Sequence, residues 1–185
     1  MLSYGTSWLN PVSGCRERRL WYDSAMTFMP NHSVRRIISG GQTGVDRGAL
    51  DAAIYLGIDH GGWCPRGRLA EDGLIPARYE LTETDSAKYP VRTAQNVMNS
   101  DGTLILYERE LQGGTSLTLR LAKEHGKPCL AIDLASPLDA ELAHGWIADH
   151  AIAVLNIAGP RESSSPGIAD AARSFIVQLL GADAT

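Results

Sequence analysis

The stretch "RRIISGGQTGVDRGALDAAI", residues 35–54, places a short apolar run, a glycine-rich turn and an amphipathic run in direct succession. Apolar residues recur at helical spacing over residues 45–54, so the order predicts a buried strand, a tight turn and a helix. Such turns often bind phosphate, but this one contains neither GxGxxG nor GxxxxGK[ST]. It also places an acid, Asp46, in the first turn of the helix, where a bound anion would lie.

The alternation of strand and helix continues to the C-terminal end of the sequence. Apolar runs predict further strands at residues 57–65, 102–108, 127–134 and 151–159. Helical spacing predicts helices at residues 89–100, 115–126, 138–150 and 166–181. In the helix at 89–100, we expect Val91, Ala94, Val97 and Met98 to share the side that faces the core.

This pattern indicates the fold class. Strands that are apolar throughout and alternate with helices form parallel sheets that are covered on both faces. We therefore predict a Rossmann-like three-layer α/β/α sandwich with a mostly parallel sheet of about five strands.

The length allows one well-buried domain. At 185 residues, the chain is too short for two ordinary domains. Residues 1–33 show no sustained period and are interrupted by Gly, Pro, Asn and Ser. We expect residues 1–33 to be an N-terminal extension, poorly ordered or peripheral, and residues 34–185 to form a single Rossmann-like ligand-binding domain.

Composition argues against several classes of function. A formal charge of -4 gives no reason to expect a nucleic acid as partner. No stretch is long and apolar enough to predict a membrane span. The three cysteines stand in unrelated contexts, and they form neither a disulfide framework nor a CxxC metal site. Because the N-terminus also lacks a secretion signal, we expect a cytoplasmic protein.

Four polar loops follow predicted strands. They read "GGQTGVD", "WCPRGRLAEDG", "ERELQGGTS" and "AGPRESSSPG". In open parallel sheets, ligands bind beyond the carboxyl ends of the strands. We therefore expect these loops to meet at one edge of the sheet and to form a composite site.

Two of these loops carry a glycine-rich turn before a helix. Glycine lets a ligand approach backbone N–H groups, and a helix N-terminus carries a partial positive charge. The alternative is a tight turn that binds nothing. The candidate ligand-binding residues of these loops are Gly40, Gly41, Gln42, Thr43 and Gly44 in the first, and Gly113, Gly114, Thr115 and Ser116 in the third.

Asp46 leaves two interpretations of the first loop open. In the first turn of a helix its carboxylate stabilises the helix dipole, but it would repel a phosphate at the same N–H groups. Either Asp46 pairs with a neighbouring arginine, or the loop binds a group that donates hydrogen bonds, such as a ribose or a pterin ring. Asp46 is a candidate site residue in both cases.

The remaining candidates for ligand binding lie in the second and fourth loops. Arg66, Arg68 and Arg161 carry guanidinium groups that match phosphate or carboxylate oxygens, although the same groups could pair with acids of their own loops. Gly159 and Glu162 lie beside Arg161. No catalytic motif with nucleophile and base is present, and no metal ligands stand at suitable spacing. We therefore predict a binding protein with no catalytic residues.

Five blocks of the sequence resemble one protein family. They are "ISGGQTGVDRGALDAAI", "HGGWCPRGRLAEDGLIPARYELTET", "RTAQNVMNSDGTLI", "GGTSLT" and "NIAGPRES", which "PGI" follows. Together they resemble the molybdenum carrier (molybdenum cofactor carrier-like) family, within the Rossmann-like lonely-guy/lysine-decarboxylase-like nucleotide-binding superfamily. The resemblance runs from about Arg35 to Leu180.

The resemblance implies a ligand and partners. It implies that the chain binds the molybdenum cofactor (molybdopterin), a pterin with a terminal phosphate and a dithiolene-bound metal, or a related nucleotide. The family's phosphate-binding loop falls on residues 40–44, and its second glycine pair on Gly113 and Gly114. It further implies a homo-oligomer that protects the cofactor or hands it to molybdoenzymes.

An enzymatic alternative is also open, namely a nucleoside-phosphate glycosidase or transferase, or else a nucleotide-sensing module. Asp46, Glu71 and Glu162 are the candidate acids or bases for such chemistry. In the related phosphoribohydrolases, a catalytic glutamate follows the second glycine motif. Depending on the alignment, this chain has Thr118 or Arg120 there, and neither can act as a carboxylate.

Overall fold

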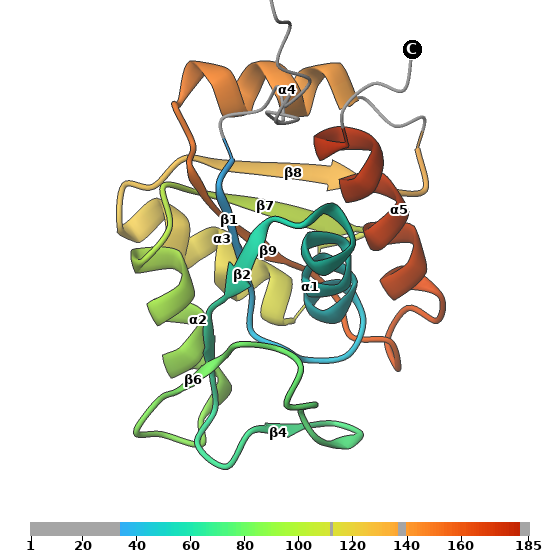
Figure 1. Ribbon diagram of the computed structural model, residues 1–185. Coiled ribbons are helices and arrows are strands. Elements are labelled where there is room, and N and C mark those ends of the chain that lie inside the picture. Colours follow the sequence, from blue (N-terminus) through green and yellow to red (C-terminus); the bar gives the residue numbers. More distant parts are fainter. Residues whose placement is uncertain (1–33, 112, 137–139, 182–185) are drawn as a thin grey trace, which may run out of the picture.

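The computed structural model describes residues 34–111, 113–136 and 140–181 (Figure 1). The proposed N-terminal extension, residues 1–33, lies outside the described residues. In chain order the elements are β1 (Arg36–Ile38), α1 (Val45–Leu56), β2 (Asp59–Gly61), β3 (Trp63–Cys64), β4 (Leu69–Ala70), β5 (Gly73–Leu74), β6 (Thr82–Glu83), α2 (Tyr89–Met98), β7 (Gly102–Tyr107), α3 (Gly114–Glu124), β8 (Cys129–Asp133), α4 (Ala140–Asp149), β9 (Val154–Ala158) and α5 (Ile168–Leu180).

The main sheet has five strands in the order β2-β1-β9-β7-β8. Every neighbouring pair in it is parallel, which confirms the predicted sheet. Helix α1 packs against α5, which also contacts α4, and α2 packs against α3. Figure 1 shows α1 and α5 on one side of the sheet and α2 and α3 on the other, so the chain forms the expected three layers.

The strands are buried because both faces of the sheet are covered. Five of the six residues of β7 are buried, and so are four of the five residues of β9. Their apolar side chains join those of α1, α4 and α5 in one core cluster. Burial on both faces explains why these strands read as continuous apolar runs. No described helix has the length and apolar character that crossing a membrane requires.

The predicted strand at 57–65 is in fact two strands. Residues up to Gly61 pair with β1, whereas β3 leaves the sheet and pairs with β6. Between them Gly62 has φ 123, and a Cβ there would lie 2.2 Å from the carbonyl oxygen of Ser39. Because only glycine permits both this conformation and this approach, the strand ends at Gly62.

Arg68 holds the segment between β3 and α2 together. Its guanidinium donates hydrogen bonds to four backbone carbonyl oxygens at 3.0–3.4 Å, those of Ile75, Pro76, Tyr79 and Leu81. We expected Arg68 to bind an anionic ligand. The structure instead uses its donors on the backbone of its own segment.

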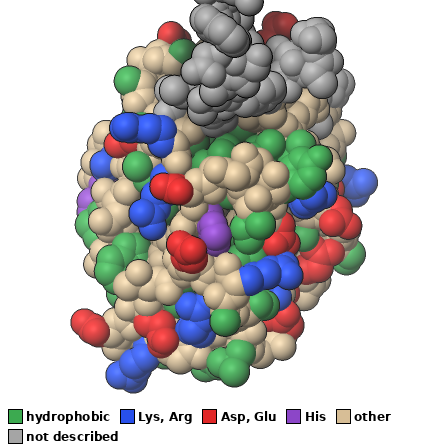
Figure 2. Space-filling model, viewed as in Figure 1, with side chains coloured by type: hydrophobic (Ala, Val, Ile, Leu, Met, Phe, Trp, Pro, Cys, Tyr) green, Lys and Arg blue, Asp and Glu red, His purple; other side chains and the backbone are tan. Residues whose placement is uncertain are grey.

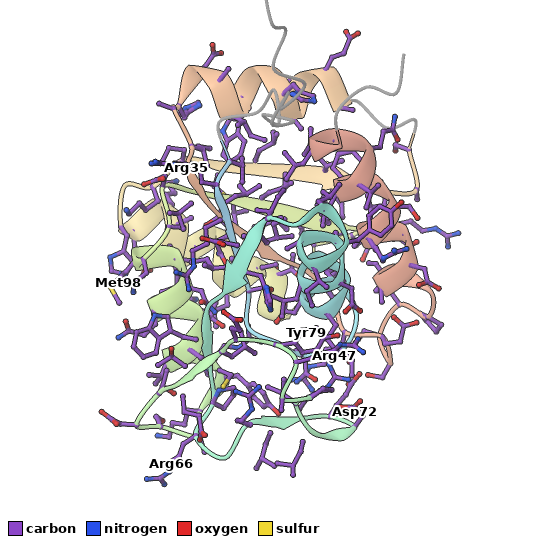
Figure 3. All side chains as sticks on the ribbon, viewed as in Figure 1. Arg35, Arg47, Arg66, Asp72, Tyr79 and Met98 are labelled. Carbon is purple, nitrogen blue, oxygen red and sulfur yellow. The ribbon has the colours of Figure 1, made fainter. Side chains whose placement is uncertain are left out.

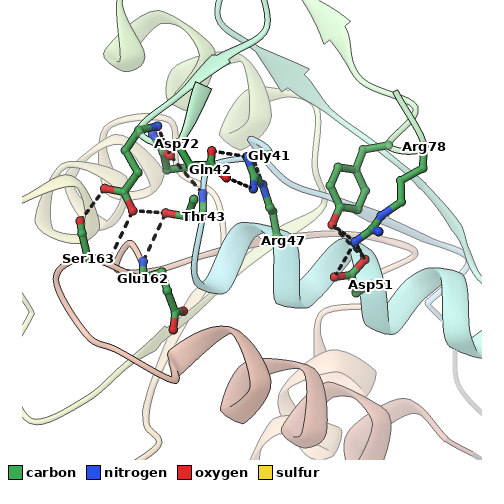
Figure 4. Close-up of polar contacts among 11 residues, drawn as sticks. Gly41, Gln42, Thr43, Arg47, Asp51, Asp72, Arg78, Glu162 and Ser163 are labelled. Carbon is green, nitrogen blue, oxygen red and sulfur yellow. Dashed lines mark hydrogen bonds and ion pairs between the residues drawn. The ribbon is translucent and has the colours of Figure 1, made fainter. Parts of the chain in front are cut away.

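Ionic contacts attach the same segment to α1 (Figure 4). Arg47 donates to both oxygens of Asp72, at 2.6 and 2.7 Å. Asp51 accepts from Arg78 at 2.9 Å and from the hydroxyl of Tyr79 at 2.9 Å. On the face shown in Figure 2, basic and acidic side chains are interspersed, and no extended basic surface is visible on that face.

Glu71 joins its own loop to the loops of Thr43 and Ser163 at the carboxyl edge of the sheet. Its carboxylate accepts hydrogen bonds from the hydroxyls of Thr43 and Ser163 and from the N–H of Ser163. Partial burial alone would raise the pKa of Glu71, but these hydrogen bonds and nearby Arg161 bring it below its ordinary value. The carboxylate therefore stabilises the folded chain in its ionised form.

We predict that Gly48→Ala destabilises the fold. A Cβ at Gly48 would lie 2.3 Å from the carbonyl oxygen of Ala169 in α5, so α1 and α5 would have to move apart. We expect the free energy of unfolding to fall by about 1–3 kcal/mol in a denaturant titration. Gly145→Ala is the matched control, because no described atom lies within 4 Å of a Cβ there. It should raise the stability by up to about 1 kcal/mol, and equal effects of both changes would contradict the close packing.

We predict that Glu71→Gln lowers stability in a pH-dependent way. A glutamine cannot accept all the hydrogen bonds that the carboxylate accepts, so the variant should lose about 1–2 kcal/mol at neutral pH. Because the folded pKa of Glu71 is lowered, its contribution is complete above the unfolded pKa. It disappears as the pH falls through the folded pKa. Denaturant titrations from pH 7 to pH 3 should show the wild type and the variant converging at acid pH, whereas a constant difference would contradict this role.

Candidate functional site

The strand order creates a crevice at the carboxyl edge of the sheet. From β1 the chain moves to β2 at one edge, and from β7 it moves to β8 at the other, with β9 between the two halves. Ligands of open parallel sheets bind at such a switch of direction. A cavity of about 840 Å³ lies there. Its lining includes Gln42, Asp46, Tyr89, Arg92, Glu108, Arg109, Gly113, Gly114, Thr115, Thr118, Gly159, Arg161, Ser163 and Ser165.

Three of the four predicted loops reach this cavity. The candidate residues that line it are Gln42, Asp46, Gly113, Gly114, Thr115, Gly159 and Arg161. The candidates outside its lining are Gly40, Gly41, Thr43, Gly44, Arg66, Arg68, Ser116 and Glu162. The second loop contributes no lining residue, and its Arg66 points away from the molecule at the far end of the segment (Figure 3).

Asp46 pairs with an arginine, which decides between the two interpretations of the first loop. Only 3% of Asp46 is exposed, and its Oδ2 accepts from Nη1 of Arg92 at 3.0 Å and from the N–H of Gln42 at 3.3 Å. The arginine comes from α2 and not from a neighbouring loop. A Cβ at Gly40 would lie 1.6 Å from Arg92 Nη1, so Gly40 provides the space for this ion pair.

Two buried donors near the ion pair have no acceptor among the described residues. They are Nε2 of Gln42 and Nε of Arg92. The orientation of the Gln42 amide follows from its Oε1, which accepts from the N–H groups of Thr43 and Glu71 at 3.0 and 2.9 Å. Because an unsatisfied buried donor costs about 1–3 kcal/mol, such groups normally bind a water or a ligand.

The N-terminus of α3 opens onto the cavity without a cap. The helix begins at Gly114, with no capping side chain and no acid in its first turn. No described atom lies within 4 Å of a Cβ built on Gly113 or Gly114. The first N–H groups of α3 therefore form a free anion-binding position.

Carboxylates or a proline occupy the N-termini of α1, α2 and α5 at this edge. Asp46 lies in the first turn of α1, and Pro90 removes an N–H donor from the start of α2. The carboxylate of Glu162 accepts from the N–H groups of Gly167 and Ala169 at the start of α5. We expected Glu162 to contact a ligand, but the structure uses it as the cap of α5.

Two further cations face the cavity. The guanidinium of Arg161 lies 4.9 Å from the ring centroid of Tyr89, and its contact to Glu71 is long, at 3.9 Å. Arg109 has φ 64, and its N–H donates to Asp133 at the end of β8. That hydrogen bond is the main cause of the lowered pKa of Asp133. Asp133 thereby fixes the backbone of the loop that carries Arg109.

The sequence did not indicate the role of α2. We expected Val91 and Met98 to face the core, but each is 38% exposed, whereas Asn96 is buried and bonds both backbone groups of Trp63. The inward side of α2 is mixed, because Val97 is fully buried beside the polar Asn96 while Arg92 lines the cavity. The spacing of Arg92 and Asn96, one helical turn apart, was the available signal.

Comparisons with known proteins agree with this architecture. The model of the circularly permutated YpsA SLOG family matches residues 37–180. Among solved structures, the chain is similar to a putative molybdenum carrier protein from Syntrophus aciditrophicus SB, with 46% sequence identity and a TM-score of 0.79. That similarity covers 82% of this chain and 97% of the other. The curated proteins contain no match. The family resemblance seen in the sequence is confirmed, and the chain belongs to the circularly permutated YpsA SLOG family.

Proposed function

We propose that this protein is a carrier that binds a phosphorylated heterocycle, the molybdenum cofactor or a related nucleotide, in the cavity at the carboxyl edge of the sheet. The observation that carries the proposal is the uncapped N-terminus of α3, which opens onto a cavity of about 840 Å³. The volume is within the range of small-molecule sites, roughly 300–1,000 Å³.

The residues of the cavity fit such a ligand. A phosphate would bind the N–H groups of Gly113, Gly114 and Thr115, where no described side chain competes for them. Arg109 and Arg161 supply positive charge at the cavity wall. The described residues contain no group of three or more metal-ligating side chains, so the proposed contacts go to the phosphate and the ring of the cofactor. The dithiolene of the cofactor would bring its own metal.

The similar protein supports the choice of cargo. Its name is that of a molybdenum carrier, and it shares 46% of its residues with this chain. A carrier would protect its cargo in the cytoplasm and hand it to molybdoenzymes. We also propose that the protein assembles as a homo-oligomer.

The contacts of three carboxylates favour binding over turnover. Asp46 is paired with Arg92, Glu71 joins three loops, and Glu162 caps α5. Each of these carboxylates is thus engaged with other parts of the protein. Of the two positions that align with the phosphoribohydrolase glutamate, Thr118 donates its hydroxyl to the carbonyl of Gly114 within α3, and Arg120 pairs with Glu124 on the helix surface.

We predict that the purified protein retains its cargo. Full-length protein from cells that make the molybdenum cofactor should release a fluorescent pterin on denaturation. Native mass spectrometry should show one bound small molecule per chain. Absence of bound pterin, together with no binding of pterin or nucleoside phosphates on titration, would contradict the carrier proposal.

We predict that a negative charge at the start of α3 weakens ligand binding. Gly114→Asp should lower the affinity for a phosphorylated ligand such as GMP by about tenfold or more, because the carboxylate competes with phosphate for the helix N-terminus. Gly114→Asn has the same shape without the charge and isolates the electrostatic effect. Calorimetric titration of both variants gives the comparison, and equal affinities would show that the phosphate binds elsewhere.

A further inference from the structure

Glu108 is a carboxylate that the proposed phosphate site does not use. It follows directly after β7, whose first five residues are buried, so the backbone that positions it is fixed by the core. Glu108 is half-buried and lines the cavity. The hydroxyl of Ser165 donates to its Oε2, while no described residue donates to its Oε1. The cavity thus contains an oriented carboxylate with spare acceptor capacity.

The chemistry of a carboxylate limits what Glu108 can bind. An ionised carboxylate only accepts hydrogen bonds, so it favours a ligand that presents donors. Two donors side by side on a rigid ring edge would bind both oxygens in charge-assisted hydrogen bonds. Guanine and pterin share such an edge, in which a ring N–H lies beside an exocyclic amino group.

Two unpaired donors lie just beneath the surface of the same cavity. They are Nε2 of Gln42 and Nε of Arg92, which lack acceptors among the described residues although both residues line the cavity. Both atoms are buried, so a ligand in the cavity reaches them only if these side chains shift. In guanine and pterin, the carbonyl oxygen next to the ring N–H would then accept from them, beside the donors that Glu108 requires.

We infer that Glu108 determines specificity and selects ligands with a 2-amino-lactam ring, the edge common to guanine and pterin. The inference rests on the proposed function, because the phosphate at α3 brings the ring into the cavity. It goes beyond the proposed function by naming the residue that selects the ring and the ring edge that this residue binds.

Three probes separate the ring from the phosphate. GMP carries the complete edge, IMP lacks only the exocyclic amino group, and ribose 5-phosphate lacks the ring. By calorimetric titration, the full-length wild type should bind GMP about tenfold or more tightly than IMP. Glu108→Gln should reduce the affinity for GMP to that for IMP, and it should leave ribose 5-phosphate binding within about twofold.

A control variant shows whether any loss of the preference for GMP is specific to Glu108. Glu124→Gln changes an exposed carboxylate that pairs with Arg120 on the surface of α3, and it should keep the preference for GMP. Equal binding of GMP and IMP by the wild type, or a preference that survives Glu108→Gln, overturns the inference while phosphate binding upholds the proposed function. A loss of ribose 5-phosphate binding in Glu108→Gln also overturns it, because Glu108 would then contact the sugar. If none of the three probes binds, the inference is overturned, and the carrier proposal is decided separately by the release of pterin from the purified protein.

Discussion

The floor of the cavity depends on the buried ion pair between Asp46 and Arg92. Asp46 is almost fully excluded from water, and an unpaired carboxylate there would be strongly unfavourable. The pair joins α1 to α2 across the end of β1 and requires Gly40 to lack a side chain. It also places a positive charge beside Asp46, so an anion can bind nearby without facing an isolated carboxylate.

The ion pair belongs to a wider division of roles among the helix N-termini. Each parallel strand directs the following helix N-terminus to the same edge, and each N-terminus attracts negative charge. The carboxylate of Asp46 lies in the first turn of α1, Glu162 accepts from N–H groups at the start of α5, and α3 has no acid in its first turn. Glu71 then fixes the loops around these ends. A cavity with fixed loops and the open N-terminus of α3 is suited to binding a charged ligand in one orientation.

The fold was largely predictable because a strand that is buried on both faces of the sheet has a continuous apolar sequence. The runs ending at Ile38, Tyr107 and Ala158 are apolar wherever the sheet is covered, and period and turn residues located the helices. The break at Gly62 was missed because a strand pattern does not show that the chain must pass within contact of Ser39. The inward face of α2 was only partly predicted: Val97 is buried as its spacing indicates, but Asn96 and Arg92 also face inward, because polar loops and a cavity lie beside this helix.

The sequence by itself determined the parallel sheet, the order of its elements, the edge at which the loops meet and the family. The first three follow from periodicity and glycine placement, which are local properties of the chain, and the family follows from the resemblance of five sequence blocks. Only the tertiary structure decided which polar side chains face the cavity. Arg68 and Glu162 resemble ligand-binding residues in the sequence but bond to backbone, while Arg92 and Glu108 stand in unremarkable positions and line the cavity. Whether a charged side chain binds a ligand or the protein backbone depends on which groups lie within hydrogen-bond distance of it. Residues far apart in the chain bring those groups together, so the sequence pattern does not reveal them.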